Sequence, residues 1–201
     1  MSASNALAQV VSEGPQQLRV PLFESITAGL DDEARHVLID CGPARAGMIE
    51  MLTGLRCRLD VLDLPARLDS LATLPEDADL VAWFAERLPP AGSEPADLIL
   101  CWNLLDYLTP AQISALMSVL IPRLRPGGRV HALVQYSSPR MPAGPGGMAP
   151  HGRTVLNVDS DGPANRNTPR HSRGTLEKFM QGLKAERTML LSNGMQEYLF
   201  G

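Results

Sequence analysis

The segment from residue 36 to residue 55 constrains the fold more than any other part of this sequence. Residues 36–40 read HVLID, an apolar run that ends in an acid, and residues 41–47 are mostly small. Apolar residues then recur three or four positions apart up to Leu55, which is typical of a helix with one buried face. A buried strand, a tight turn and a helix in this order predict an α/β domain with a parallel sheet.

The turn in this segment resembles a known cofactor-binding motif. Residues 40–47 (DCGPARAG) resemble the first motif of the Rossmann-like, class I S-adenosylmethionine (SAM) methyltransferases, acid-x-Gly-x-Gly-x-Gly; Asp40 and Gly42 match, whereas Ala44 and Ala46 replace glycines. An alanine forced into the left-handed conformation costs roughly 1–2 kcal/mol. Each alanine is therefore expected to weaken SAM binding about tenfold. The alternative is the first strand of an α/β domain whose turn holds no ligand.

The next strand pattern supplies a candidate ribose ligand. Residues 57–64 become apolar towards their end, and Asp63 stands there, two positions before Pro65. An acid about twenty residues beyond the turn is placed to accept hydrogen bonds from the two ribose hydroxyls. Asp63 is the expected ribose ligand; the alternative is an acid that caps the following turn.

A short third strand is expected over residues 80–84 (LVAWF), after a helix over residues 66–74. The resemblance implies an acid near the end of this strand that meets the adenine amine. Phe84 stands at that position here, and Glu86 follows two residues later. Trp83 and Phe84 are expected either to cover a purine face or to lie in the core.

The clearest strand pattern covers residues 96–103, and the exit loop that follows it also resembles the family. Thr109 and Pro110 predict the start of a helix, which ends at the corner LRPGG of residues 124–128 before a fifth strand. The resemblance implies that Gly42, Ala44 and Ala46 lie along the methionine part of SAM. It also implies that Trp102 and Asn103 border the sulfonium.

The remaining segments complete the predicted domain. Asn193-Gly194 predicts a tight antiparallel hairpin with two positive-φ positions, so we expect a doubly wound three-layer sandwich with a seven-stranded, mostly parallel sheet that ends in this hairpin. Residues 1–35 are expected to form a helical extension, and residues 36–201 the Rossmann-like domain. Residues 137–171, rich in Gly, Pro and Arg, are expected to form a long loop. It either closes over an acidic or phosphorylated substrate or is a mobile tether.

Charge and cysteine content limit the partners and the compartment. The net charge of −4 argues against nucleic acid or an anionic membrane as a partner, and no apolar run is long enough for a membrane span. Cys41, Cys57 and Cys101 are not arranged as C-x-x-C, which favours reduced thiols and no metal site. We therefore expect a cytoplasmic protein of 201 residues.

Two functions are consistent with these features. One is SAM-dependent methyl transfer to a small-molecule or protein acceptor, in which a general base is optional because the sulfonium is already a strong electrophile. His151 and His171, in the predicted loop, are candidates for such a base, whereas His131 lies in a predicted strand. The other is a methyltransferase-like domain that has lost SAM and acts as a binding or regulatory subunit.

Overall fold

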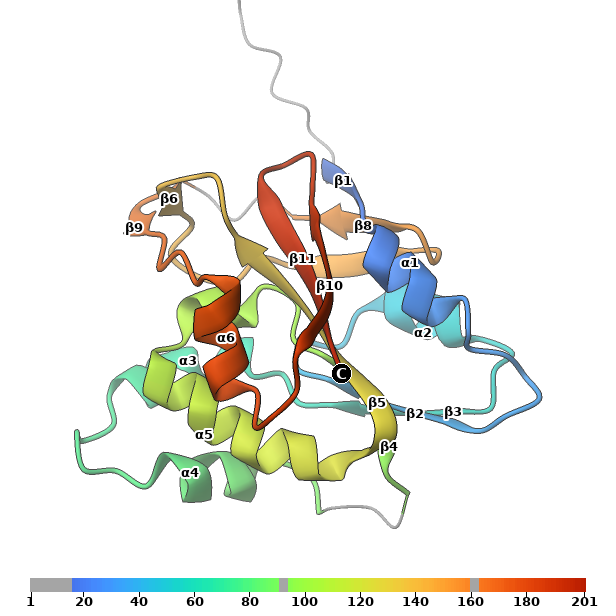
Figure 1. Ribbon diagram of the computed structural model, residues 1–201, viewed down its shortest axis with the longest axis horizontal. Coiled ribbons are helices and arrows are strands. Elements are labelled where there is room, and N and C mark those ends of the chain that lie inside the picture. The colour runs from blue at the N-terminus through green and yellow to red at the C-terminus, as the bar shows by residue number, and fades with distance from the viewer. Residues whose placement is uncertain (1–15, 91–93, 160–162) are drawn as a thin grey trace, which may run out of the picture.

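The computed structural model describes residues 16–90, 94–159 and 163–201. Its centre is a six-stranded sheet of order β10-β11-β5-β4-β2-β3, with helices α3 to α6 on one face and α1 and α2 on the other (Figure 1). The parallel strands are β2 (His36–Asp40), β3 (Cys57–Val61), β4 (Ala96–Leu100) and β5 (Leu124–Gln135). The antiparallel hairpin consists of β10 (Ala185–Leu190) and β11 (Met195–Phe200). The predicted α/β sandwich with a closing hairpin is thus confirmed, but with six strands instead of seven.

Strand β2 lies at the middle of both cores. All five of its residues are buried, with Val37 and Ile39 in the core under helices α3 to α6 and Leu38 in the core under α1 and α2. Such two-sided burial is typical of a strand inside a parallel sheet. The β2 strand therefore fixes the position of the turn that follows it.

The strand expected over residues 80–84 is wrong. These residues begin helix α4 (Leu80–Arg87), whose N-cap Asp79 accepts a hydrogen bond from the backbone N–H of Ala82 at 3.0 Å. Trp83 and Phe84 point into the core that also contains Ile113 of α5 (Pro110–Leu120). Because α4 takes the place of a third strand, β3 is left at the edge of the sheet.

The predicted helix start at Thr109 is confirmed, whereas the C-terminal hairpin has a different turn from the predicted one. Thr109 and Gln112 form a reciprocal capping box at the start of α5. The Pro122 segment tightens the end of this helix into a short 3-10 helix, η3 (Ile121–Arg123). In the C-terminal hairpin only Gly194 has a positive φ, of 83°, and Leu191 and Met195 pair across the turn. The turn is therefore a three-residue loop rather than the predicted two-residue one.

The segment over residues 137–171 is not a structureless loop. It contains β6 (Arg140–Met141), β7 (Met148–His151), β8 (Val155–Val158) and β9 (Arg166–Asn167). Strands β7 and β8 form a small antiparallel sheet with β1 (Gln16–Arg19). Strand β7 of this sheet lies beside α2 (Figure 1). Strand β8 forms ladder hydrogen bonds with β1, which is distant in sequence. The local sequence of residues 137–171 alone therefore does not indicate these strands. Of the helical extension expected over residues 1–35, residues 1–15 lie outside the described residues.

The remaining helices are short. They are α1 (Pro21–Thr27), α2 (Ala46–Leu52), η1 (Pro65–Arg67), α3 (Leu68–Ala72), η2 (Leu104–Tyr107) and α6 (Arg173–Phe179). Within the described residues, no helix has the length and apolar character that a membrane crossing requires.

A fully buried carboxylate joins the two ends of the described chain. Glu197 of β11 accepts hydrogen bonds from the backbone N–H groups of Leu22 (2.9 Å) and Phe23 (2.7 Å). These groups belong to the first turn of α1, which has no intrahelical acceptors of its own. The same carboxylate lies 2.8 Å from Nε2 of His131 on β5. Helix α1 is thereby fixed to the sheet.

Candidate functional site

The sheet has a topological switch point between β2 and β4. Strand β2 leads through α2 to β3 on one side, whereas its other neighbour, β4, leads through α5 to β5 on the opposite side. In open α/β sheets, divergent connections of this kind leave a crevice at the carboxyl ends of the two strands, and ligands usually bind there. Asp40 and Gly42 follow β2, and Trp102 and Asn103 follow β4. The predicted site residues therefore meet at this edge.

The Asp40 carboxylate is buried and already engaged. Its Oδ1 accepts hydrogen bonds from Nε1 of Trp102 at 2.6 Å and from the backbone N–H of Gly42 at 2.8 Å. Asp40 is 2% exposed, and burial raises its pKa to about 6, although the two hydrogen bonds act in the opposite direction. Asp40 thus orders both the turn after β2 and the indole after β4.

The Trp102 ring lies directly on Gly42. A Cβ atom at Gly42 would come within 2.8 Å of Cδ1 of Trp102, so only glycine allows this approach. Trp102 has a φ of 48° and is 5% exposed, and its ring packs 5.6 Å from that of Phe23. The indole therefore fills the space beside the turn, where the family resemblance implies the methionine part of SAM.

Strand β7 covers the other end of the turn. A Cβ on Gly47, in the first turn of α2, would collide with the carbonyl oxygen of Pro150. Arg45 forms an ion pair with Asp159 at 3.4 Å. Ala44 and Ala46 are exposed, and neither has a positive φ. The predicted left-handed strain at these alanines is therefore absent, because the turn has a different backbone conformation.

Asp63 lies close to this turn. Its backbone N–H donates to the carbonyl of Gly42 at 3.1 Å, and its φ is 45°. The residue is half-buried and follows β3, so it lies at the same edge of the sheet as Asp40.

Phe84, by contrast, is 1% exposed in the core between the sheet and α5. The structure therefore brings together Asp40, Gly42, Asp63, Trp102 and Asn103, but not Phe84. Ala44 and Ala46 continue along the turn with exposed side chains.

Sequence reasoning missed Asp106, the second buried carboxylate near the crevice. Its Oδ2 accepts a hydrogen bond from the backbone N–H of Gln135 at 2.7 Å, whereas Oδ1 has no partner among the described residues. Burial raises the pKa of Asp106 to about 7. An acid inside the apolar run LLDYL was the available signal, since charged residues are rarely buried without a specific role.

Two cavities flank the ends of the central strands. One of about 290 Å³ is lined by Asn103, Asp106 and Gln135 together with residues of β7 and β11. The other, of about 640 Å³, lies between η1, α3, the start of α5 and residues 143–145, with Arg166 at its wall. Among the described residues no group of three or more His, Cys, Asp or Glu could hold a metal ion.

The candidate bases occupy different environments. His131 is fully buried in β5 beside Glu197, as a strand residue. His151 is exposed on β7. Burial lowers the pKa of His171, which keeps this imidazole neutral near pH 7.

No protein-family model and no curated protein matches this sequence. Solved structures with a similar chain path include the N-methyltransferase NodS from Bradyrhizobium japonicum WM9, at 15% identity and a TM-score of 0.49 over 89% of this chain and 90% of that one. Another is the 1,6-didemethyltoxoflavin-N1-methyltransferase from Burkholderia thailandensis, with bound S-adenosylhomocysteine. It matches at 18% identity and a TM-score of 0.48, over 89% of this chain and 76% of that one. A third is the pyocyanin biosynthetic protein PhzM, at 17% identity and a TM-score of 0.48 over 89% of this chain. The present chain spans about half, 53%, of the length of PhzM.

Proposed function

We propose that this chain binds SAM at the switch point of its sheet and transfers the methyl group to a small-molecule acceptor. The observation that carries the proposal is the meeting of Asp40, Gly42, Asp63, Trp102 and Asn103 at the carboxyl ends of β2, β3 and β4. These are the residues at which the sequence resembles the SAM methyltransferases. The crevice at a switch point is also where open α/β sheets bind nucleotides.

The residues fit SAM differently at its two ends. On the ribose side, Asp63 is half-buried and would accept hydrogen bonds from the hydroxyls. On the methionine side, the ligand fits only after the Trp102 indole leaves Gly42, because the ring is in contact with that glycine. Binding would therefore break the 2.6 Å hydrogen bond between Trp102 and Asp40. We expect this rearrangement to weaken the affinity.

The chain's part in the reaction is alignment. SAM, when bound, supplies an electrophilic methyl group. The turn after β2 and Asn103 at the end of β4 would hold the reacting groups in line, and such positioning alone accounts for a large part of the rate of many two-substrate reactions.

A second candidate is favoured by the packing of Trp102. Asp40 accepts from the indole, Gly42 makes room for it, and the indole itself is 5% exposed among core residues. Each of these three residues thus has a structural role that requires no ligand. On this basis the domain would be a non-catalytic binding or regulatory subunit.

Calorimetric titration with SAM and with S-adenosylhomocysteine separates the two candidates. We expect saturable binding to the wild-type protein at or below roughly 100 μM, near −5.5 kcal/mol. Trp102→Ala should bind at least about tenfold more tightly, because the indole no longer competes for Gly42. Trp83→Ala, the same truncation in the core beside α5, serves as the control and should bind like wild type.

Trp102→Phe covers the case in which Trp102→Ala does not fold, since it keeps a ring but loses the bond to Asp40. Absence of binding at millimolar ligand in the wild type and in both Trp102 variants would contradict methyl transfer and support the second candidate. Binding that is equal in all of these proteins would contradict the proposed competition by the indole.

A further inference from the structure

The Asp106 side chain lacks a compensating partner for one of its two oxygens. The residue is 2% exposed, and the hydrogen bond from Gln135 holds its other oxygen in place. Within residues 16–90, 94–159 and 163–201, Oδ1 has no hydrogen-bond partner, and no ion pair involves this carboxylate. A buried acceptor without a donor costs about 1–3 kcal/mol, and more if it is charged. A ligand with a donor group would remove this cost.

The unpaired carboxylate lines the cavity of about 290 Å³. This volume is at the lower end of the usual range for small-molecule sites, about 300–1,000 Å³. The wall combines three thioether side chains, Met141, Met148 and Met195, with the amides of Asn103 and Asn193. Among its described lining residues, the cavity thus offers apolar side chains and one buried acid.

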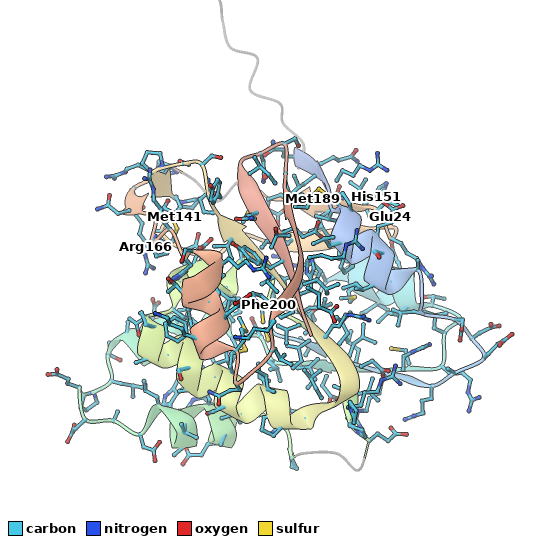
Figure 2. All side chains as sticks on the ribbon, in the orientation of Figure 1. Glu24, Met141, His151, Arg166, Met189 and Phe200 are labelled. Carbon is cyan, nitrogen blue, oxygen red and sulfur yellow. The ribbon has the colours of Figure 1, made fainter. Side chains whose placement is uncertain are left out.

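Arg166 lies near Asp106 but does not donate a hydrogen bond to its free oxygen. Arg166 of β9 pairs in register with Met141 of β6, and the two side chains appear on the same side in Figure 2. Its guanidinium lies 5.3 Å from the centre of the Tyr107 ring. The other acid at the cavity, Asp159, is exposed and paired with Arg45. The charge of Arg166 acts on Asp106 and lowers its pKa, against the larger effect of burial, but no hydrogen bond reaches Oδ1. A donor for Oδ1 must therefore come from outside the described residues.

We infer that this cavity binds a small molecule with a protonated amine at one end and a compact apolar body. The ammonium would donate to Oδ1 of Asp106, and the body would lie against the three methionines, which adapt to varied apolar shapes. Hydrogen bonds between charged partners are the strong ones in such a site. A role for the amine as methyl acceptor would rest on the proposed function, but binding of the amine does not.

The test uses phenethylamine as the probe and 2-phenylethanol as its neutral counterpart, with no SAM present. In protein labelled at the methionine methyl groups, phenethylamine should shift the NMR signals of Met141, Met148 and Met195 saturably. The signals of Met117 and Met180, which lie in the other core, should stay in place. Because SAM is absent, failure of this test leaves the methyl-transfer proposal standing, and failure of SAM titration leaves this one standing.

Asp106→Asn keeps the shape and the acceptor for Gln135 but removes the charge. We expect it to weaken phenethylamine binding at least about tenfold and to change 2-phenylethanol binding little. Asp69→Asn, at the wall of the larger cavity, is the matched control and should behave like wild type.

Val158→Phe narrows the cavity without altering the acid, and it should weaken both probes. It also provides a second variant if Asp106→Asn does not fold. Equal binding of phenethylamine to wild type and Asp106→Asn would overturn the inference. So would shifts confined to Met117 and Met180, or no saturable shift in the wild type.

Discussion

Asp40 and Asp106 are buried carboxylates, and neither forms an ion pair within the described residues. Burial raises the pKa of Asp40 to about 6 and that of Asp106 to about 7, because the charged form loses its hydration. Both groups therefore bind a proton in the folded protein over a pH range in which the unfolded chain has released it.

The pKa of Asp106 predicts how stability depends on pH. Between about pH 4 and pH 7 the folded state holds more protons than the unfolded state, so the free energy of unfolding falls as the pH rises through this range. Asp106→Asn removes the part of this dependence that Asp106 contributes, whereas the part from Asp40 remains. Relative to wild type, the variant should gain at least about 1 kcal/mol of stability near pH 8 compared with pH 4.5, as measured by urea unfolding.

Asp69→Asn is the control for this measurement because Asp69 is exposed. A stability difference between Asp106→Asn and wild type that is the same at both pH values would contradict the raised pKa.

At single positions, the sequence predicted the acid and the first glycine of the turn but not what they contact. Asp40 and Gly42 stand where the motif requires them, yet their nearest partner is the indole of Trp102, 62 residues further along the chain. The direction of that ring depends on a positive φ at Trp102, which no local pattern predicts for a bulky side chain. Asp106 was missed because its burial depends on the neighbouring strands.

At the scale of elements, helix α4 replaces an expected strand, and its N-cap can be tested. Asp79 accepts from Ala82 at the start of the helix, and replacement of such a cap by alanine costs about 1 kcal/mol. Asp79→Ala should therefore lower the free energy of unfolding by about that amount. Asp77→Ala, which changes an exposed acid two residues before the cap, should have little effect in the same urea titration. Equal losses in the two variants would contradict the capping role.

Elements with a complete local signal were predicted correctly, and those that depend on distant partners were not. The helix after Thr109 carries its own capping box, and the C-terminal hairpin carries its own turn glycine. Residues 80–84 present only a short apolar run, which periodicity cannot assign to strand or helix. Strand β8 pairs with β1, about 140 residues away in sequence, so residues 137–171 looked like a loop.

At the scale of the whole molecule, Glu197 joins α1, β5 and β11 through one buried carboxylate. Glu197→Gln keeps the size of the side chain but leaves His131 and the first turn of α1 with poorer acceptors. A buried group left with a poorer hydrogen-bond partner costs about 1–3 kcal/mol, and several groups are affected here, so we expect destabilisation of about 3 kcal/mol in urea unfolding.

Glu186→Gln is the matched control on the neighbouring strand β10. Glu186 forms a half-exposed ion pair with Arg129 at 2.9 Å, and such surface pairs contribute less than about 1 kcal/mol. A loss of stability in Glu197→Gln no larger than in Glu186→Gln would contradict the role of Glu197 as the link between these elements.

The mostly parallel sheet that ends in an antiparallel hairpin followed from the sequence because most of its strands have their own apolar run and exit turn. The replacement of a strand by α4 and the small sheet of β1, β8 and β7 could not be predicted from the sequence, because both depend on which segments meet in space. The β7 strand that crosses Gly47 lies far from the turn in sequence, and it changes the entrance to the crevice.

The contact between Trp102 and Gly42 also bears on how such a chain can diverge. A larger residue at position 42 would strike the indole, whereas a smaller residue at position 102 would free position 42 to accept a side chain. Among descendants of this sequence, positions 42 and 102 would therefore be expected to change together. A glycine at position 42 would then indicate a tryptophan at position 102 rather than a retained cofactor.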